Sequence, residues 1–272
     1  MFARNTDTGA AVANRFLRRA DAGLIAEKLC TKAVMERGLI AEGDRILIGA
    51  SGGKDSTVLA WLLSRLRSVL RVNFELTAVH ITGDFENGED SGTGGSIKSI
   101  LAERMGGWNI PFVNLDVPVT GRLKPGRQMN CYWCSTQRRT ELLHYAIENH
   151  FSKIALGHHL DDIIETFFMN MMNKGELKAM PILLSYTKYP VSLIRPLAYL
   201  EEKQIIACAE KLDVLGSVCT CPYGVNSGRA EIRKKIAELC GGRGEVKRRI
   251  LAALSSGQND LLIESGTGPG SH

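Results

Sequence analysis

This 272-residue sequence has few prolines, no long apolar run and no recognisable secretory leader. It contains only 8 prolines, and its 28 glycines follow no collagen-like period. No apolar run approaches the roughly 20 residues that a membrane span needs. The first residues, MFARNTDTGAAVANRFLRR, include no continuous apolar segment, so we expect no secretory signal; the arginines keep an organelle presequence as an alternative. We therefore predict a globular, cytoplasmic protein without membrane contact.

Composition excludes two further classes of protein. Hydrophobic residues make up 44% of the chain and charged residues 23%, which is ordinary globular usage rather than that of a disordered or fibrous chain. The seven cysteines, an odd number in a long chain, do not fit a small secreted disulfide framework. The formal net charge of +5 is modest.

Apolar periodicity predicts an α/β protein in which strands and helices alternate. Such alternation favours a doubly wound parallel sheet, here with N- and C-terminal helical extensions. We expect strands at 45–50, 74–81, 110–115, 153–157 and 191–194, and helices at 11–40, 57–70, 136–149, 161–173, 201–213, 228–240 and 244–255. The predicted divisions are an N-terminal helical extension (1–43), a nucleotide-binding α/β domain (44–200), a C-terminal helical region (201–256) and a disordered tail (257–272).

A glycine-rich hexapeptide, SGGKDS, follows the first predicted strand and opens the next helix. Its residues are Ser51, Gly52, Gly53, Lys54, Asp55 and Ser56. Two glycines let the backbone approach an anion, the helix start offers N–H groups, and a lysine and two hydroxyls add donors. The spacing is not that of a Walker A loop. An ordinary strand-to-helix turn is the alternative.

This hexapeptide resembles the loop of the PP-loop pyrophosphatases, which cleave ATP between the α and β phosphates. The resemblance implies that the loop holds pyrophosphate and that the substrate is activated as an adenylate. Lys54 and Asp55 are then candidates for catalysis as well as for binding. The motif does not choose the substrate.

The cysteines fall into two clusters and three isolated positions. Cys131 and Cys134 form a CxxC before a predicted helix, and Cys219 and Cys221 form a CxC. Thiolates benefit from the positive end of a helix dipole, and soft sulfur ligands suit an iron–sulfur cluster or zinc. The isolated Cys30, Cys208 and Cys240 are expected to be small buried hydrophobes.

Combined with SGGKDS, these cysteines resemble those of the tRNA 2-thiocytidine synthetase family of PP-loop enzymes. The matching segments are GDRILIGASGGKDS, NFELTAVHI, CYWCSTQRR, KIALGHHLDDIIETFFMN, GELKAMP and IRPLAY. The resemblance implies a 4Fe-4S cluster on Cys131, Cys134 and Cys221. Cys221 is preferred over Cys219 because Arg229 follows it by eight residues, as an arginine follows the third cysteine in that family. It also implies ATP and Mg²⁺, a tRNA cytidine as substrate, and a cysteine desulfurase or other sulfide donor. The segment CPYG departs from this family and resembles the 2-thiouridine enzymes.

The segment GHHLDD follows a predicted strand, at the sheet edge where doubly wound proteins bind ligands. Asp161 and Asp162 could position Mg²⁺ or transfer a proton; alternatively, Asp161 caps a helix and Asp162 compensates its dipole. The family resemblance favours the functional reading, with Gly157 and His158 lining the nucleotide pocket. His80 could approach adenine or be structural. Arg138, after the CxxC, could meet phosphate or sulfide, or be a solvated helix residue.

Basic residues gather in clusters that suit an RNA backbone. They are Arg122, Lys124 and Arg127; Arg229, Arg233, Lys234 and Lys235; and Lys247, Arg248 and Arg249. Other readings stay open: a 2-thiouridine thiolase, a small-molecule thiolase, a PP-loop ligase with a structural zinc site, and a metal-stabilised RNA-binding module. The oligomeric state is not fixed by the sequence, and a homodimer is one option.

Overall fold

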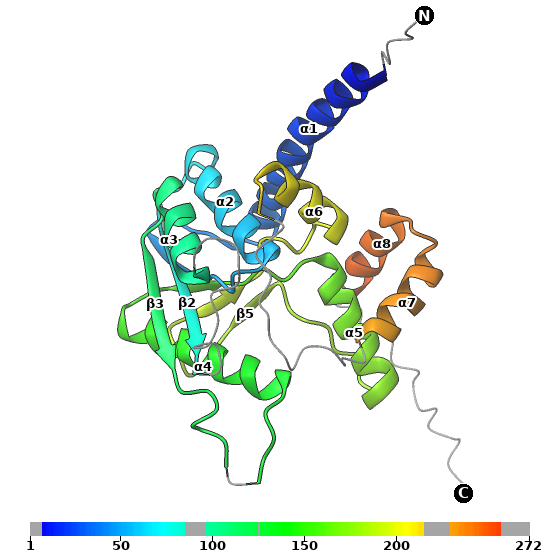
Figure 1. Cartoon of the computed structure of the whole chain (residues 1–272). Helices are drawn as coiled ribbons and strands as arrows, with labels where there is room; N and C mark the ends of the chain where they lie inside the picture. The colour runs from blue at the N-terminus through cyan, green and yellow to red at the C-terminus, as the bar shows by residue number, and fades with distance from the viewer. Residues whose placement is uncertain (1–6, 85–95, 125, 215–228, 257–272) are drawn as a thin grey trace, which may run out of the picture.

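The computed structural model describes residues 7–84, 96–124, 126–214 and 229–256. The strands are β1 (Asp44–Gly49), β2 (Phe74–Gly83), β3 (Phe112–Val117), β4 (Lys153–Ala155), β5 (Leu183–Ser185) and β6 (Ser192–Ile194). The helices are α1 (Asp7–Glu36), α2 (Lys54–Val69), α3 (Ile97–Gly107), α4 (Cys131–Glu148), α5 (Leu160–Lys174), α6 (Glu202–Lys211), α7 (Arg229–Cys240) and α8 (Gly244–Ser255). Figure 1 shows helices on both sides of the sheet, with α5, α7 and α8 grouped beside it.

The six strands form one sheet in the order β3-β2-β1-β4-β6-β5. The first five in this order are parallel, and β5 runs antiparallel to β6 at the edge. The strand order switches sides at β1: β2 and β3 are added on one side of β1, and β4 and the later strands are added on the other. Doubly wound proteins bind ligands at the carboxyl edge beside such a switch point. The segments that follow β1 and β4 therefore come together at this edge.

Three clusters of buried side chains hold the layers together. Alternate residues of β1 point to opposite faces, so Ile46 and Ile48 pack with α1, α2, α3 and α6, whereas Leu47 packs with α4. A third cluster joins α5 to α7 and α8 through Ile163, Ile232 and other apolar residues. The C-terminal helices thus share a core with α5, the helix that begins after β4.

The structure confirms the α/β class and every expected strand and helix among the described residues, with shifted ends. The expected helix at 57–70 begins at Lys54, so half of SGGKDS belongs to α2. Two elements were missed: α3, and the antiparallel strand β5. The tail 257–272, expected to be disordered, and residues 85–95 lie outside the described residues. The division into domains remains a prediction.

Two expectations about burial have different outcomes. Cys30, Cys208 and Cys240 are fully buried, as expected for structural thiols, and burial raises the pKa of Cys30 to about 12 and that of Cys208 to about 11. The spacing of Ile163, Ile164, Phe167, Phe168, Met171 and Met172 also predicts an apolar stripe packed in the core. The two isoleucines are buried and Phe168 packs on the same cluster, but Met172 is exposed. Among the described residues, no helix has the length and apolarity needed to cross a membrane.

Candidate active site

The loop after β1 is closed by its own hydroxyl groups. The backbone N–H of Ser51 donates to Oγ of Ser56 over 3.2 Å, and that hydroxyl donates to the carbonyl of Gly53 over 3.0 Å. Gly52 has a φ of +84°, and a Cβ atom there would lie 2.9 Å from Ile97. Only glycine adopts this conformation without strain and fits beneath α3. The sequence therefore forms a tight loop in which Gly52 is buried against Ile97 and Ser51 is exposed.

The loop leads directly into the positive end of α2. Gly53 is the N-cap, and within the described structure no side chain makes a capping hydrogen bond to this helix. The N–H groups of the first turn are therefore open to an anion, as in other loops that bind phosphate. This geometry suits an anionic group such as a phosphate.

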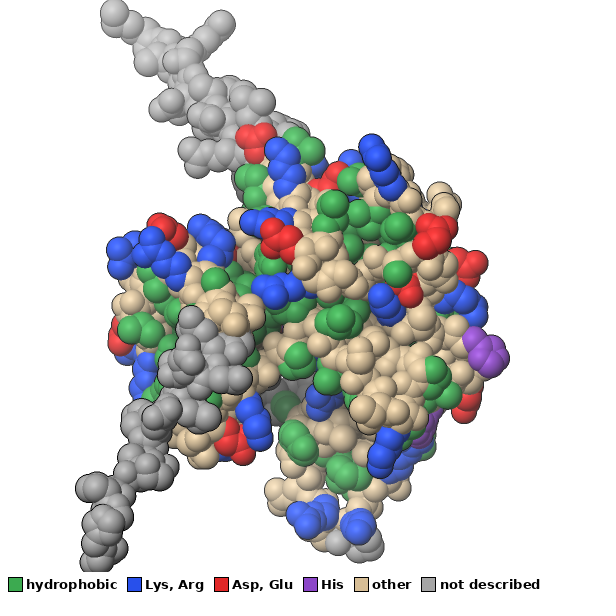
Figure 2. All heavy atoms as spheres, turned by 180° about the vertical axis from the view of Figure 1, so that it is seen from behind, with side chains coloured by type: hydrophobic (Ala, Val, Ile, Leu, Met, Phe, Trp, Pro, Cys, Tyr) green, Lys and Arg blue, Asp and Glu red, His purple; other side chains and the backbone are tan. Residues whose placement is uncertain are grey.

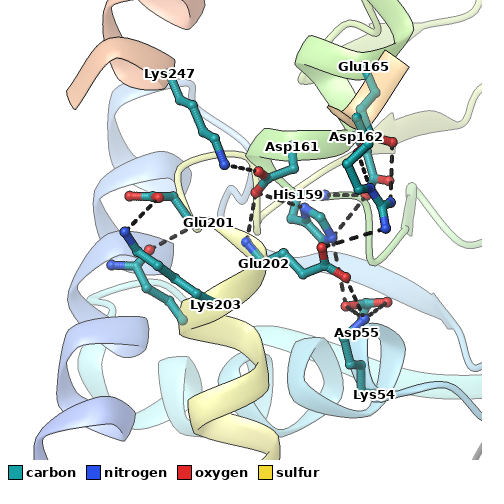
Figure 3. Close-up of polar contacts among 12 residues, drawn as sticks. Lys54, Asp55, His159, Asp161, Asp162, Glu165, Glu201, Glu202, Lys203 and Lys247 are labelled. Carbon is teal, nitrogen blue, oxygen red and sulfur yellow. Dashed lines mark hydrogen bonds and ion pairs between the residues drawn. The ribbon is translucent and has the colours of Figure 1, made fainter. Parts of the chain in front are cut away.

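Lys54 lies between two carboxylates in the structure. Its Nζ is 3.2 Å from Oδ1 of Asp55 and 3.3 Å from Oε1 of Glu202, at the start of α6 (Figure 3). Burial lowers the pKa of Lys54, but the two ion pairs outweigh it and leave the pKa above its ordinary value. The lysine is therefore fully charged, and a phosphate at the loop would compete with Glu202 for it.

The turn after β4 lies against this loop. A Cβ atom on Gly157 would come within 3.0 Å of the backbone of both Asp55 and Ser56, so only glycine allows this approach. The contact carries His159, which is almost fully buried, to 3.9 Å between its Nε2 and Oδ1 of Asp55. The sequence-predicted residues Gly157 and His158 thus lie beside SGGKDS, with His158 half-buried.

Asp161 and Asp162 have different partners. Oδ1 of Asp161 accepts from Nζ of Lys247 on α8 over 2.5 Å, and Oδ2 accepts from the N–H of Glu202 over 2.7 Å. Burial raises the pKa of Asp161, but these donors outweigh it and hold the pKa below its ordinary value. Asp162 accepts from the N–H of His159 over 3.0 Å.

The helix-capping contact of α5 therefore comes from Asp162, and Asp161 joins α5 to α6 and α8 (Figure 3). A metal ion at Asp161 would have to displace Lys247, so these contacts do not support Mg²⁺ there. Catalytic roles for both aspartates stay predictions.

His80 lies in β2, the neighbour of β1, toward the carboxyl edge of the sheet. The side chain is 4% exposed, and its Nδ1 is 2.6 Å from the carbonyl oxygen of Ala50, the residue before the loop. The ring therefore supports the backbone that enters SGGKDS. Contact between His80 and adenine stays a prediction.

The CxxC begins α4, on the opposite face of the sheet from α2. Oδ1 of Asn130 caps the helix by accepting from the N–H of Trp133 over 2.9 Å. Cys131 is exposed and Cys134 is buried, one helical turn apart, and Arg138 is half-buried on the next turn. Because β3 runs parallel to β2, α4 starts at the carboxyl edge, where SGGKDS also lies.

The cysteine set is incomplete in the part of the chain that the structure describes. Cys219 and Cys221 lie outside the described residues. Within those residues, no group of three or more His, Cys, Asp or Glu is arranged to hold a metal ion. Two thiols on one turn at a helix N-terminus suit two corners of an iron–sulfur cluster, and a third ligand has to come from elsewhere.

Comparison with known proteins decides the family. A family model described as the PP-loop domain matches residues 25–240. The chain belongs to the PP-loop family. Two similar proteins are the tRNA-cytidine(32) 2-sulfurtransferases of Acinetobacter baumannii and Anaeromyxobacter dehalogenans. The first is 39% identical over 210 residues, which cover 76% of this chain and 67% of the relative; the second is 34% identical over 227 residues, covering 82% and 76%.

A solved structure has the same fold. The U34-tRNA thiolase NcsA from Methanococcus maripaludis, solved with its 4Fe-4S cluster, aligns with a TM-score of 0.68 at 24% identity. The alignment covers 87% of this chain and 78% of that one. The fold class and the resemblance to PP-loop enzymes predicted from the sequence are thereby confirmed, and the enzyme names of the relatives support a catalytic activity.

Two residues of this PP-loop site, Glu202 and Arg195, were not found by sequence reasoning, and Lys247 was predicted only as part of a basic cluster for RNA. Glu202 and Lys247 come from α6 and α8, far along the chain from their partners Lys54 and Asp161. Arg195, directly after β6, is 5% exposed, and burial lowers its pKa to about 10. Its Nη1 donates to the carbonyl of Pro181, and its Nε has no hydrogen-bond partner among the described residues. The only available signal was its position after a strand, inside the matching segment IRPLAY.

Proposed function

We propose that this protein is an ATP-dependent tRNA sulfurtransferase that replaces the C2 oxygen of a tRNA cytidine by sulfur. The observation that carries the proposal is that two motifs lie at the same sheet edge. They are the open anion-binding loop at the start of α2 and the CxxC at the start of α4. A ligase that only adenylates its substrate has no need for the thiols. The relatives at 39% and 34% identity, named for cytidine 32, support the choice of base.

The chain's own residues account for the activation step. The backbone of Ser51–Ser56 and the ammonium of Lys54 would bind the phosphates of ATP. Attack of the cytidine C2 oxygen on the α-phosphorus then forms an adenylate and releases pyrophosphate. Lys54 would exchange its ion pair with Glu202 for one with the pyrophosphate and so neutralise part of the charge of this leaving group. His80, Gly157 and His158 would line the nucleotide, and Arg138 would meet phosphate or sulfide at the CxxC.

The cysteines account for the second step. Cys131, Cys134 and Cys221 would hold a 4Fe-4S cluster, which supplies sulfide when bound. Replacement of the adenylate oxygen by sulfide releases AMP and leaves 2-thiocytidine. Mg²⁺ would accompany ATP, and a cysteine desulfurase or other donor would renew the sulfide. We propose that the enzyme works in the cytoplasm; a homodimer is compatible with this scheme.

A second candidate is a 2-thiouridine enzyme. The segment CPYG, from Cys221 to Gly224, favours it because the 2-thiouridine enzymes carry a similar CPY. The chemistry and the cysteine ligands would be the same, and only the base would differ.

Nucleoside mass spectrometry of tRNA tests the proposal. Cells that lack the protein should lack 2-thiocytidine, and the unchanged chain should restore it. Cys131→Ala should not restore it, whereas Cys208→Ala, which removes an equally small side chain from the core, should. Loss of 2-thiouridine instead would favour the second candidate, and unchanged tRNA would contradict both.

Metal analysis of the same proteins tests the ligands. Anaerobically purified protein should contain iron and acid-labile sulfide at about four each per chain. Cys221→Ala should lose the iron and Cys219→Ala should retain it; the reverse pattern would move the third ligand to Cys219. Stoichiometric zinc without iron would make the cysteine site structural.

A further inference from the structure

The segment between β3 and α4 extends away from the body of the protein (Figure 1). We call residues 118–124 and 126–130 the β3–α4 loop; it ends at Asn130, immediately before Cys131. The proposed function assigns no role to this loop. Its residues nevertheless adjoin the candidate cluster ligands directly.

The base of the loop is fixed to the body at three places. The carboxylate of Asp84, after β2, accepts from the N–H groups of Thr120 and Gly121 over 2.9 and 3.0 Å. Nη1 of Arg122 donates to Glu141 on α4 over 2.5 Å. Nε1 of Trp133 donates to the carbonyl of Val119 over 3.0 Å. These contacts hold the loop in a defined position relative to the start of α4.

The far part of the loop presents positive charge. Lys124 and Arg127 are exposed, and neither has an ion-pair partner among the described residues. Figure 2 shows Lys and Arg side chains at the end of the projection that extends from the body. Cations held at the end of an anchored loop are suited to a phosphate backbone, with which they exchange counterions.

The two aromatic residues inside the CxxC point in different directions. Trp133 packs against the α4 face of the core and makes the hydrogen bond described above. Tyr132 is 78% exposed, the highest exposure among the large hydrophobic side chains of the described residues. Tyr132 directly follows the exposed Cys131 at the start of α4, so a base stacked on its ring would lie at the helix end that carries this thiol.

We propose that Tyr132 and the β3–α4 loop form a platform for an unpaired stretch of tRNA, with a base stacked on Tyr132 and phosphates on Lys124 and Arg127. This inference rests on the proposed function and names the part of the chain that presents the substrate. Proteins recognise RNA mostly in single-stranded loops, where unstacked bases stack on aromatic side chains. Tyr132 is a positioning residue, since it would orient the nucleotide at the start of α4, beside the exposed Cys131.

The turn between β5 and β6 offers matched control residues. Lys188 and Tyr189 are also exposed, and Tyr189 lies edge-on to Tyr186 with ring centroids 5.9 Å apart. This turn precedes β6, so it lies at the amino edge of the parallel strands, opposite the candidate active site. An exposed lysine and tyrosine are thus available where no platform is proposed.

Binding of two RNA probes tests the proposal. The probes are a stem-loop oligonucleotide with an unpaired loop and a fully paired duplex of the same length. Tyr132→Ala should weaken binding of the stem-loop about tenfold. Tyr132→Phe, which keeps the ring, and Tyr189→Ala should bind it as the unchanged protein does. The duplex, whose bases are already stacked, should show no such loss.

Salt dependence tests the cations separately. The double variant Lys124→Ala, Arg127→Ala should reduce the slope of log affinity against log salt by about one to two, because each phosphate contact contributes about 0.7 for single strands. Lys188→Ala should leave the slope unchanged. Sulfur transfer to tRNA at subsaturating RNA should fall in the Tyr132→Ala and double variants, with cluster iron retained.

Three outcomes separate the platform from the proposed function. If the unchanged protein transfers sulfur but Tyr132→Ala binds the stem-loop equally well, the platform is wrong and the function stands. Equal losses on stem-loop and duplex would likewise overturn stacking. If the unchanged protein transfers no sulfur to tRNA, the proposed function itself fails.

Discussion

Removal of the Lys247 ammonium should destabilise the protein through Asp161. The pair is largely buried, with the Lys247 side chain 20% exposed and that of Asp161 12%. A fully buried ion pair that loses one partner costs about 3–5 kcal/mol. Asp161 would keep the hydrogen bond from the N–H of Glu202, so we expect Lys247→Met to lower the free energy of unfolding by about 2 kcal/mol.

The matched control lies on the same helix. Arg249 pairs with Glu245 at 2.6 Å, but their side chains are 76% and 66% exposed. Arg249→Ala should therefore change the free energy of unfolding by less than about 0.5 kcal/mol. Urea denaturation measures both: the midpoint should fall for Lys247→Met with the slope unchanged. Equal midpoints for the two variants would refute the assignment of stability to the Asp161 pair.

The same pair predicts a pH dependence. The pKa of Asp161 in the folded protein lies below its ordinary value of 3.8, so the carboxylate stabilises the fold at higher pH. This stabilisation is lost as the pH falls from about 3.8 through the folded pKa. The difference between the unchanged protein and Lys247→Met should therefore shrink in that acid range. A difference that stays constant below pH 3.8 would contradict the pairing.

Three further variants or measurements examine the loop and the thiols. Lys54→Ala should abolish cleavage of ATP to AMP and pyrophosphate while circular dichroism and metal content stay unchanged; undiminished cleavage would contradict the loop assignment. Gly157→Ala should weaken ATP binding, measured calorimetrically, because its Cβ would meet the loop backbone at 3.0 Å; unchanged affinity would show that the loop adjusts freely. In native protein freed of metal, iodoacetamide should modify exposed Cys131 and spare buried Cys208, whose raised pKa disfavours the thiolate. Peptide mass spectrometry reads the pattern, and rapid modification of Cys208 would contradict its burial.

The parts of the fold that were predicted are those that local sequence determines. The loop Ser51–Ser56 was found because its glycines, its strand and its helix are contiguous in the chain. The strand β5 was missed because it is a short edge strand that buries none of its three residues, whereas β4 and β6, equally short, each bury two and show as apolar runs. The helix α3 was missed because it buries only Leu101 and Met105, so its apolar pattern is weak.

The parts of the site that were missed depend on contacts between distant residues. Lys54 and Glu202 are 148 residues apart, and Asp161 and Lys247 are 86 apart. A sequence pattern indicates that these groups are charged, but only the packing of α6 on α2 and of α8 on α5 brings them together. In the same way, the letters CYWC do not reveal which of the two rings faces solvent.

Because α2, α4 and α5 all start at one sheet edge, the affinities for the two proposed substrates, ATP and tRNA, should respond differently to salt. Each helix start carries about half a positive elementary charge from its aligned peptide dipoles, and this charge is absent from the formal total of +5. Charges at partly buried positions are screened less by mobile ions than cations on an exposed loop, which are screened within about 10 Å at 0.1 M ionic strength. Nucleotide affinity should therefore persist at salt concentrations that release RNA, so a purification in high salt would yield protein free of tRNA that still binds ATP.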